Sequence, residues 1–184
     1  KKVNIKNKIL NLLFFLMLFL YLWLFVETKF IYFGGATITR YPEFFTGINF
    51  FEKFMYIPGG LSEYIASFLA QLLQFSSLGA LVITIYCLAV YYLADKLIKL
   101  FRLKSLFWLK YILPVLIVLP YTQYSINITT VTAYIISLFF TCIYLSFIPQ
   151  NKTIRLVTFL LVSVLLYWLT AAAYLLFLVT TWLY

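Results

Sequence analysis

The feature that most constrains this chain is the alternation of long apolar stretches with short clusters of Lys and Arg. A helix needs about 20 predominantly apolar residues to cross the hydrocarbon core of a bilayer. The alternation therefore predicts an all-α fold, a polytopic transmembrane helical bundle with about six spans and interfacial amphipathic helices in its first outer loop. The expected spans are residues 9–26, 78–94, 106–121, 127–147, 154–170 and, incomplete, 171–184.

Composition supports the membrane prediction. Hydrophobic residues make up 65% of the chain, charged residues only 10%, and the mean hydropathy is +1.03. A soluble domain carries about a quarter of charged residues and could not bury so much apolar surface. We therefore expect residues 1–184 to form a single transmembrane domain. Because the chain does not begin with Met, we also expect it to be the N-terminal part of a longer protein.

The positions of the positive charges predict an orientation. Basic clusters precede the first expected span and follow the second and the fourth. If the N-terminus is cytoplasmic, only Lys29, Arg40 and Lys53 of the 14 Lys and Arg residues lie outside, in agreement with the excess of basic residues in cytoplasmic connections. The segment 27–77 is then an outer loop. The formal charge of +9 is expected to meet lipid head groups and not nucleic acid, because the basic residues form short groups beside apolar spans.

The sequence offers little for catalysis or metal binding. It has no His, a single Asp, four Glu, and no metal-ligand or phosphate-loop motif, so we expect neither a metal nor a cofactor. Cys87 and Cys142 both fall inside apolar stretches, where a buried thiol behaves as a small hydrophobic side chain. Asp95 and Lys110 are expected at the cytoplasmic surface, with the Lys110 ammonium reaching back to the interface.

The outer loop, residues 27–77, is the leading location for a functional site, because long connections without a function are uncommon in compact proteins. Its last part, residues 61–75, predicts an amphipathic helix whose large apolar face packs on the bundle or lies at the interface. The opposite face is small or polar and consists of Ser62, Glu63, Ala66, Ser67, Ala70, Gln71 and Gln74. Its polar stripe, Glu63, Ser67 and Gln71, is expected to face water or a cavity. An aromatic group before this helix is expected to anchor the loop to lipid or to the bundle; it comprises Phe44, Phe45, Phe50, Phe51 and Phe54.

The charged residues of this loop are the candidate site residues. Glu43 lies in an apolar, aromatic-rich stretch, and such surroundings raise the pKa of a carboxyl group and prepare it for acid–base catalysis. Arg40 suits a phosphate, since its planar guanidinium makes two hydrogen bonds at once. The candidate substrate-binding residues are Arg40, Lys53, Glu63 and Gln71. The alternative is that these side chains are solvated on an outward face.

One motif carries a resemblance to a family. Residues 58–71 read PGGLSEYIASFLAQ, after an aromatic-rich stretch and before an apolar span. This resembles the outer-loop pattern PGGLxEYxxxFLxQ of an uncharacterised family of bacterial inner-membrane proteins, over roughly residues 40–100. The resemblance implies location in the bacterial inner (plasma) membrane and a multi-span N-terminal part followed by further domains. It implies no established activity.

At a coarser level, the order of elements is similar to that of GT-C membrane glycosyltransferases, which use polyprenyl-phosphate sugar donors. Those enzymes have a first span, an outer loop with interfacial helices and an acidic catalytic residue, and then a bundle of spans. The resemblance implies that Glu27 or Glu43 occupies the acidic position and that a lipid-linked sugar is the substrate. The chain departs from the class in having no Asp-Asp, Asp-Glu or Glu-Asp pair after the first span.

Three hypotheses for function follow. The first is a membrane anchor or docking module whose outer loop binds a protein partner. The second is a glycosyltransferase in which Arg40 or Lys53 binds the donor phosphate and a Glu deprotonates the acceptor hydroxyl. The third is a transporter, which the sequence favours least, because transporters place ionisable or broken-helix sites near the midplane and these spans offer only the kink expected at Pro114.

Overall fold

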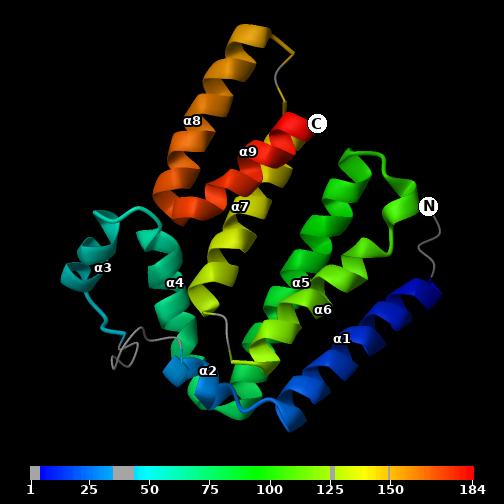
Figure 1. The fold of residues 1–184 in the computed structure, drawn as a ribbon, viewed down its shortest axis with the longest axis vertical. Coiled ribbons are helices and arrows are strands. Elements are labelled where there is room, and N and C mark those ends of the chain that lie inside the picture. The colour runs from blue at the N-terminus through cyan, green and yellow to red at the C-terminus, as the bar shows by residue number, and fades with distance from the viewer. Residues whose placement is uncertain (1–4, 35–43, 125–126, 149) are drawn as a thin grey trace.

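The computed structural model describes residues 5–34, 44–124, 127–148 and 150–184. Helices make up every regular element in these ranges, and the ranges contain no strand, which confirms the all-helical prediction. Figure 1 shows long helices packed side by side, with shorter helices gathered at one end of the bundle.

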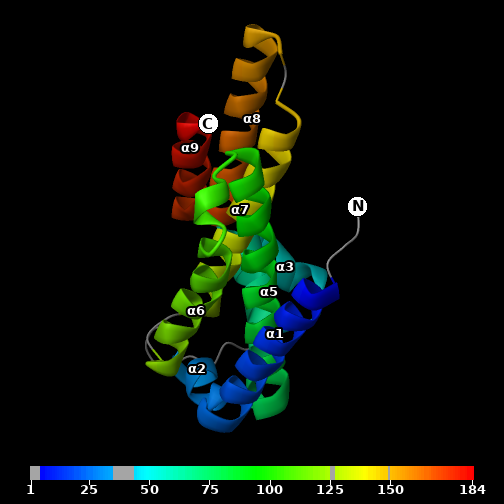
Figure 2. The same cartoon turned by 90° about the vertical axis from the view of Figure 1, so that its right-hand side faces the viewer.

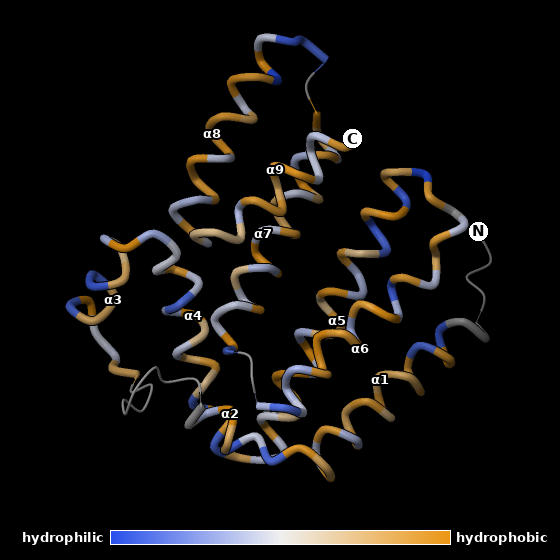
Figure 3. Tube along the Cα trace, viewed as in Figure 1, coloured by the Kyte–Doolittle hydropathy of each residue, from blue (hydrophilic) through white to orange (hydrophobic). Residues whose placement is uncertain are grey.

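Four stretches of the described chain are long and apolar enough to cross a membrane. They are Lys8–Phe25, Ser76–Leu100, Ile128–Ser146 and Lys152–Leu183. The first three lie in the helices α1 (Ile5–Phe25), α5 (Ser76–Leu100) and α7 (Ile128–Ser146). Hydrophobic residues run along these helices, and the polar ones concentrate toward helix ends and connections (Figure 3). The predicted first, second and fourth spans therefore correspond to helices of spanning length.

The fourth stretch, Lys152–Leu183, consists of two helices, and the chain reverses direction between them. Helix α8 (Lys152–Thr170) is followed by Ala171, whose φ of 47° is unusual for a residue with a side chain and ends the helix. A single 3-10 turn, η3 (Ala171–Ala173), leads into α9 (Tyr174–Leu183), which packs back on α7 and α8. Figure 1 shows this reversal. The predicted division between residues 170 and 171 falls at the same place.

The prediction of about six spans is not confirmed. Helix α6 (Leu109–Thr122), expected to be the third span, has 14 residues and contains Pro114 and Pro120. At 1.5 Å per residue it is about 21 Å long, shorter than a hydrocarbon core of about 30 Å. Helix α9 has 10 residues and is shorter still.

The described residues of the predicted outer loop form three short helices, α2 (Thr28–Gly34), α3 (Ile48–Met55) and α4 (Gly60–Ala70), and the 3-10 turn η1 (Gln71–Gln74). Figures 1 and 2 place α2 where α1 ends and α5 begins, and α4 beside the start of α7. Helix α4 also contacts α8. The short helices thus cover the end of the bundle that lies opposite the N-terminus of α1.

Helix α4 packs its small residues against the bundle. Ser62, Ala66 and Ala70 are 2%, 0% and 3% exposed, whereas the large Phe68 is 54% exposed. The small residues recur every fourth position and let α4 approach α7 closely, which the amphipathic pattern did not predict. Glu63 does remain on the exposed side, as predicted.

Candidate functional site

A groove lies where the start of α4, the start of α7 and the break between α8 and α9 meet. Its volume is about 510 Å³. Proline and glycine of the turn before α4 form one wall, and hydroxyl, carboxyl and small apolar side chains form the others. The lining residues are Pro58, Gly59, Ser62, Glu63, Thr129, Thr130, Ala133, Tyr134, Thr170, Ala171, Ala172, Ala173, Leu175 and Leu176.

The turn before α4 requires glycine at two successive positions. Gly59 has φ of 81°, and a Cβ atom there would lie 2.8 Å from the Cβ of Ala171. A Cβ atom on Gly60 would lie 1.8 Å from the carbonyl oxygen of Phe54. Real Cβ atoms do not approach backbone this closely, so any side chain at Gly60 forces α3 away from α4. The two glycines of the PGG sequence thus set how closely α4 approaches α3 and the end of α8.

Hydrogen bonds hold the same turn against α8. The Gly59 N–H donates to the carbonyl oxygen of Trp168 at 2.8 Å, and the Trp168 indole N–H donates to the Met55 carbonyl oxygen at 3.0 Å. The Ser62 hydroxyl donates to the Gly59 carbonyl oxygen at 2.7 Å. The wall that carries Glu63 is therefore fixed to both α3 and α8.

The polar groups of the groove differ in whether they have partners. The hydroxyls of Ser62 and Thr170 donate to backbone carbonyl oxygens. Within the described ranges, neither the carboxylate of Glu63 nor the side chains of Thr129, Thr130 and Tyr134 make a hydrogen bond or an ion pair. Among the described residues, no Lys or Arg lines the groove. Its chemistry is that of one carboxylate and several hydroxyl groups.

The other candidate residues that the structure describes lie elsewhere. Lys53 lines a separate hollow of about 450 Å³ at the start of α3. The Glu27 carboxylate accepts a hydrogen bond from the Ser76 hydroxyl at 3.3 Å at the junction of α1 and α2. The Gln71 amide donates to the Ser67 carbonyl oxygen at 3.3 Å. Glu27, Lys53 and Glu63 therefore do not share one cavity.

Two further candidates, Arg40 and Glu43, lie outside the described residues, so their predicted roles stay predictions.

The junction beside Glu27 is closely packed. The buried Thr28 hydroxyl donates to the Leu73 carbonyl oxygen at 2.8 Å, which ties α2 to η1. A Cβ atom on Gly79 would lie 2.5 Å from the Thr28 hydroxyl oxygen, so α5 passes directly beside α2. The Glu27 N–H also donates to the Tyr124 hydroxyl at 3.3 Å. These contacts give the residues around Glu27 a packing role.

The aromatic group predicted to anchor the loop packs against α4. The Tyr64 ring lies 5.0 Å from Phe51 and 5.6 Å from Phe54, between ring centres, and it also contacts Phe44 and Phe50. Phe45 contacts the Phe50 ring and is 57% exposed. These rings therefore hold α3 against α4 within the loop, and Phe45 also faces outward; anchoring to lipid stays a prediction.

A second polar cluster, at the opposite end of the bundle, was not predicted. The Lys110 ammonium lies 2.9 Å from one carboxylate oxygen of Asp95, and Lys99 pairs with the other. The Lys110 nitrogen also lies 5.3 Å from the centre of the Tyr91 ring and 5.5 Å from that of Tyr111. The prediction that Lys110 reaches back to the interface was incomplete, because its side chain is 19% exposed and ion-paired.

Asn11 extends this cluster to α1. Its amide nitrogen donates to the Tyr91 hydroxyl at 2.9 Å, and its amide oxygen accepts from the Tyr111 hydroxyl at 2.7 Å. One side chain thus joins α1 to both α5 and α6. The sequence signal was an amide at the start of an apolar run, where an unpaired polar group is costly. We call these residues the inner clasp: Asn11, Tyr91, Asp95, Lys110 and Tyr111.

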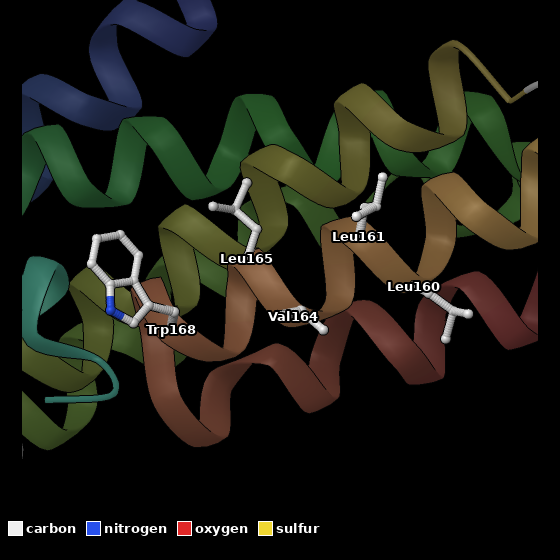
Figure 4. A pocket seen from close by; sticks show the side chains of 5 residues that line it. All are labelled: Leu160, Leu161, Val164, Leu165 and Trp168. Carbon is white, nitrogen blue, oxygen red and sulfur yellow. The ribbon is translucent and has the colours of Figure 1, made fainter. Parts of the chain in front are cut away.

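A third hollow is almost entirely apolar. It lies on the outward face of α8, has a volume of about 420 Å³, and is lined by Leu160, Leu161, Val164, Leu165 and Trp168. Figure 4 shows these side chains along one helix. Its one polar group, the Trp168 indole N–H, already donates to the Met55 carbonyl oxygen, so this face has the chemistry of a surface covered by lipid chains.

Comparison with known proteins identifies a family for this chain but no activity. One family model matches the whole chain, residues 1–184, and its description is Family of unknown function (DUF6057). No curated protein and no solved structure matches the chain. The resemblance to GT-C glycosyltransferases therefore gains no support from relatives and stays a prediction, as does the transporter hypothesis.

Proposed function

The chain belongs to this family of unknown function, and from that premise we propose that it is a multi-span membrane anchor with a docking platform at one surface of the bilayer. The platform consists of the described residues from α2 to η1, Thr28–Gly34 and Phe44–Gln74. The anchor consists of α1, α5, α7 and the α8–α9 hairpin, with α6 packed on α5.

The observation that carries this proposal is the exposure of large apolar side chains on the outer helices. Leu12 and Met17 of α1 are each 70% exposed, and Leu161 and Val164 of α8 are 66% and 70% exposed. A soluble domain does not leave contiguous apolar helix faces in water. Lipid chains cover such faces without cost, and the inward small residues of α4 suit the same environment.

The charge distribution supports a cytoplasmic N-terminus. Lys99 lies in the last turn of α5, Lys110 in the first turn of α6, and Lys152 at the start of α8. Figure 1 places these ends of the helices away from α2 and η1, on the side of the bundle where α1 begins. Basic residues on one side favour that side as cytoplasmic. The platform then faces outward from the inner membrane of a bacterium.

The platform offers a surface for a protein partner. Ile48 and Ile57 are 68% and 53% exposed, and Tyr56 is 84% exposed, around the short helix α3. Charged Glu52 and Lys53 lie exposed on the same helix. Exposed aromatic and aliphatic side chains beside charged ones are typical of protein interaction surfaces. The same mixture supports a docking function over a purely lipid-covered face.

Cysteine labelling tests the anchor and its orientation together. Both native cysteines are buried, so Cys87→Ala and Cys142→Ala give a background without thiols. On this background, Asn49→Cys adds an exposed thiol to α3, and Gln150→Cys adds one before α8. We expect a membrane-impermeant maleimide to label Asn49→Cys in intact cells and Gln150→Cys only after the membrane is opened.

The matched pair makes each outcome decisive. The reverse labelling pattern would overturn the orientation. Labelling of both positions in intact cells, or release of the chain from membranes by alkaline carbonate, would overturn the anchor itself. The labelling pattern could be as expected while Tyr56→Ala and Ile57→Ala capture a partner as well as wild type does. That result would overturn the docking function and leave the anchor in place.

A further inference from the structure

We propose that the groove at Glu63 binds a ligand through a protonated primary amine. The proposal rests on the membrane anchor proposed above, because the depth of the groove in the bilayer enters the argument. It adds a binding site and a class of ligand to that function. The ligand is either the amine head group of a lipid or a small soluble amine.

The depth of the groove follows from the position of Tyr134. This residue lies six positions after Ile128, the first residue of α7, and therefore about 9 Å along the helix at 1.5 Å per residue. In a bundle that spans the bilayer, the groove then extends from the surface into the hydrocarbon region. Thr129 and Thr130 lie within about 3 Å of the start of α7, so the hydroxyl-bearing end of the groove lies at the surface and Tyr134 at its inner end. A head group at the surface with apolar atoms below it fits this arrangement.

The charge of the groove selects a cation. Within the part of the chain that the structure describes, Glu63 is the only charged residue that lines the groove. A phosphate or carboxylate ligand would meet a negative charge without any Lys or Arg to pair with it. A divalent metal also fits poorly, because the described residues contain no group of three or more His, Cys, Asp or Glu. Among charged ligands, the groove therefore suits a monovalent organic cation.

A primary ammonium fits the remaining groups better than other cations do. It has three N–H donors. The groove supplies acceptor oxygens on Glu63, Thr129 and Thr130 and an aromatic ring on Tyr134, which attracts a cation at its face. The apolar side chains of Ala172 and Leu176 complete the wall and suit the carbon atoms next to the amine.

The size of the groove agrees with such a ligand. A volume of about 510 Å³ is within the range of small-molecule sites, about 300–1,000 Å³, and exceeds the volume of an ethanolamine group. The glycine turn and the Trp168 hydrogen bonds fix the wall that carries Glu63, so the site is formed before the ligand binds.

The test uses the full chain in nanodiscs of phosphatidylcholine. Free ethanolamine is titrated by calorimetry, and in parallel the retention of phosphatidylethanolamine, phosphatidylcholine and phosphatidylglycerol is measured by native mass spectrometry. Phosphatidylcholine is the sharpest control, because its quaternary ammonium has the same charge and no N–H donor. Glu63→Gln removes the charge, and Glu52→Gln removes an equivalent exposed charge on α3 outside the groove.

We expect Glu63→Gln to weaken amine binding about tenfold or more, as the loss of a charge-assisted hydrogen bond does, and Glu52→Gln to leave it unchanged. If the binding of free ethanolamine and the retention of phosphatidylethanolamine both require Glu63, a small amine is sufficient for binding. If only the retention of phosphatidylethanolamine requires Glu63, the ligand is the lipid head group. Both results support the proposal.

Three results would overturn it. They are equal binding by wild type and Glu63→Gln, equal retention of phosphatidylglycerol and phosphatidylethanolamine, and no binding of either amine. If Glu63→Gln fails to fold, Thr130→Val decides, because Thr130 is an exposed residue of the groove. That variant is expected to weaken amine binding severalfold, about the effect of one neutral hydrogen bond, and unchanged binding would overturn the proposal.

Discussion

The inner clasp and the Glu63 groove lie at opposite ends of the bundle and differ in how their polar groups are paired. In the clasp, Asp95 and Lys110 pair with each other and Asn11 bonds two tyrosines. In the groove, the side chains of Glu63 and Thr130 make no hydrogen bond or ion pair within the described ranges. The comparison separates two uses of polar residues in a membrane protein. Paired groups hold helices together, and unpaired groups are available to a ligand.

The largest expected effect breaks the scaffold of the groove. Gly60→Ala places a Cβ atom 1.8 Å from the Phe54 carbonyl oxygen, so α3 must move away from α4. We expect a loss of at least about 3 kcal/mol in the free energy of unfolding in detergent, because the clash involves backbone that cannot rotate away. Ser67→Ala, on the same helix, is the control and should change stability by less than about 0.5 kcal/mol. Near-equal unfolding of the two variants would contradict the close contact between α3 and α4.

The next effect breaks the clasp. Asp95→Asn removes the charge that pairs with Lys110, whose side chain is 19% exposed. We expect a loss of about 2 kcal/mol in the free energy of unfolding, as for a hydrogen bond between charged groups that are shielded from water. Lys99→Gln removes the other partner of Asp95, but the Lys99 side chain is 74% exposed and should contribute less than about 0.5 kcal/mol. Equal losses for the two variants would mean that the clasp is solvated throughout.

The positions of the long helices could be predicted from the sequence alone. Hydropathy predicted α1, α5, α7 and α8, because each of these helices has an apolar run whose length must match the bilayer. The end of α8 was predicted at residue 170, where the apolar run divides. The length of α6 was not predicted, since hydropathy does not distinguish a 14-residue helix with two prolines from a full span.

The faces and partners of the helices were harder to predict. An amphipathic pattern shows two faces of α4 but not which one faces protein, and in lipid the small face of Ser62, Ala66 and Ala70 packs inward. The groove joins residues near 60, 130 and 170, and the contacts of Asn11 with Tyr91 and Tyr111 cross separations of 80 and 100 residues. Such contacts depend on how helices pack, which no local pattern encodes.

The smallest expected effect tests whether the groove residues are free of a structural role. Glu63→Gln keeps the size of the side chain and removes a charge from the first turn of α4, where a carboxylate interacts favourably with the helix dipole. We expect a loss of no more than about 0.5 kcal/mol in the free energy of unfolding, because the side chain is exposed and makes no hydrogen bond within the described ranges.

Its neighbour Ser62 gives the matched comparison, since Ser62→Ala removes a buried hydroxyl bonded to the Gly59 carbonyl oxygen and should cost about 1 kcal/mol. The two variants change adjacent residues of one helix turn, so the difference in their loss of stability comes from burial and hydrogen bonding. If Glu63→Gln destabilises the protein more than Ser62→Ala does, the Glu63 carboxylate holds the fold together as Asp95 does, and the difference between the groove and the clasp disappears.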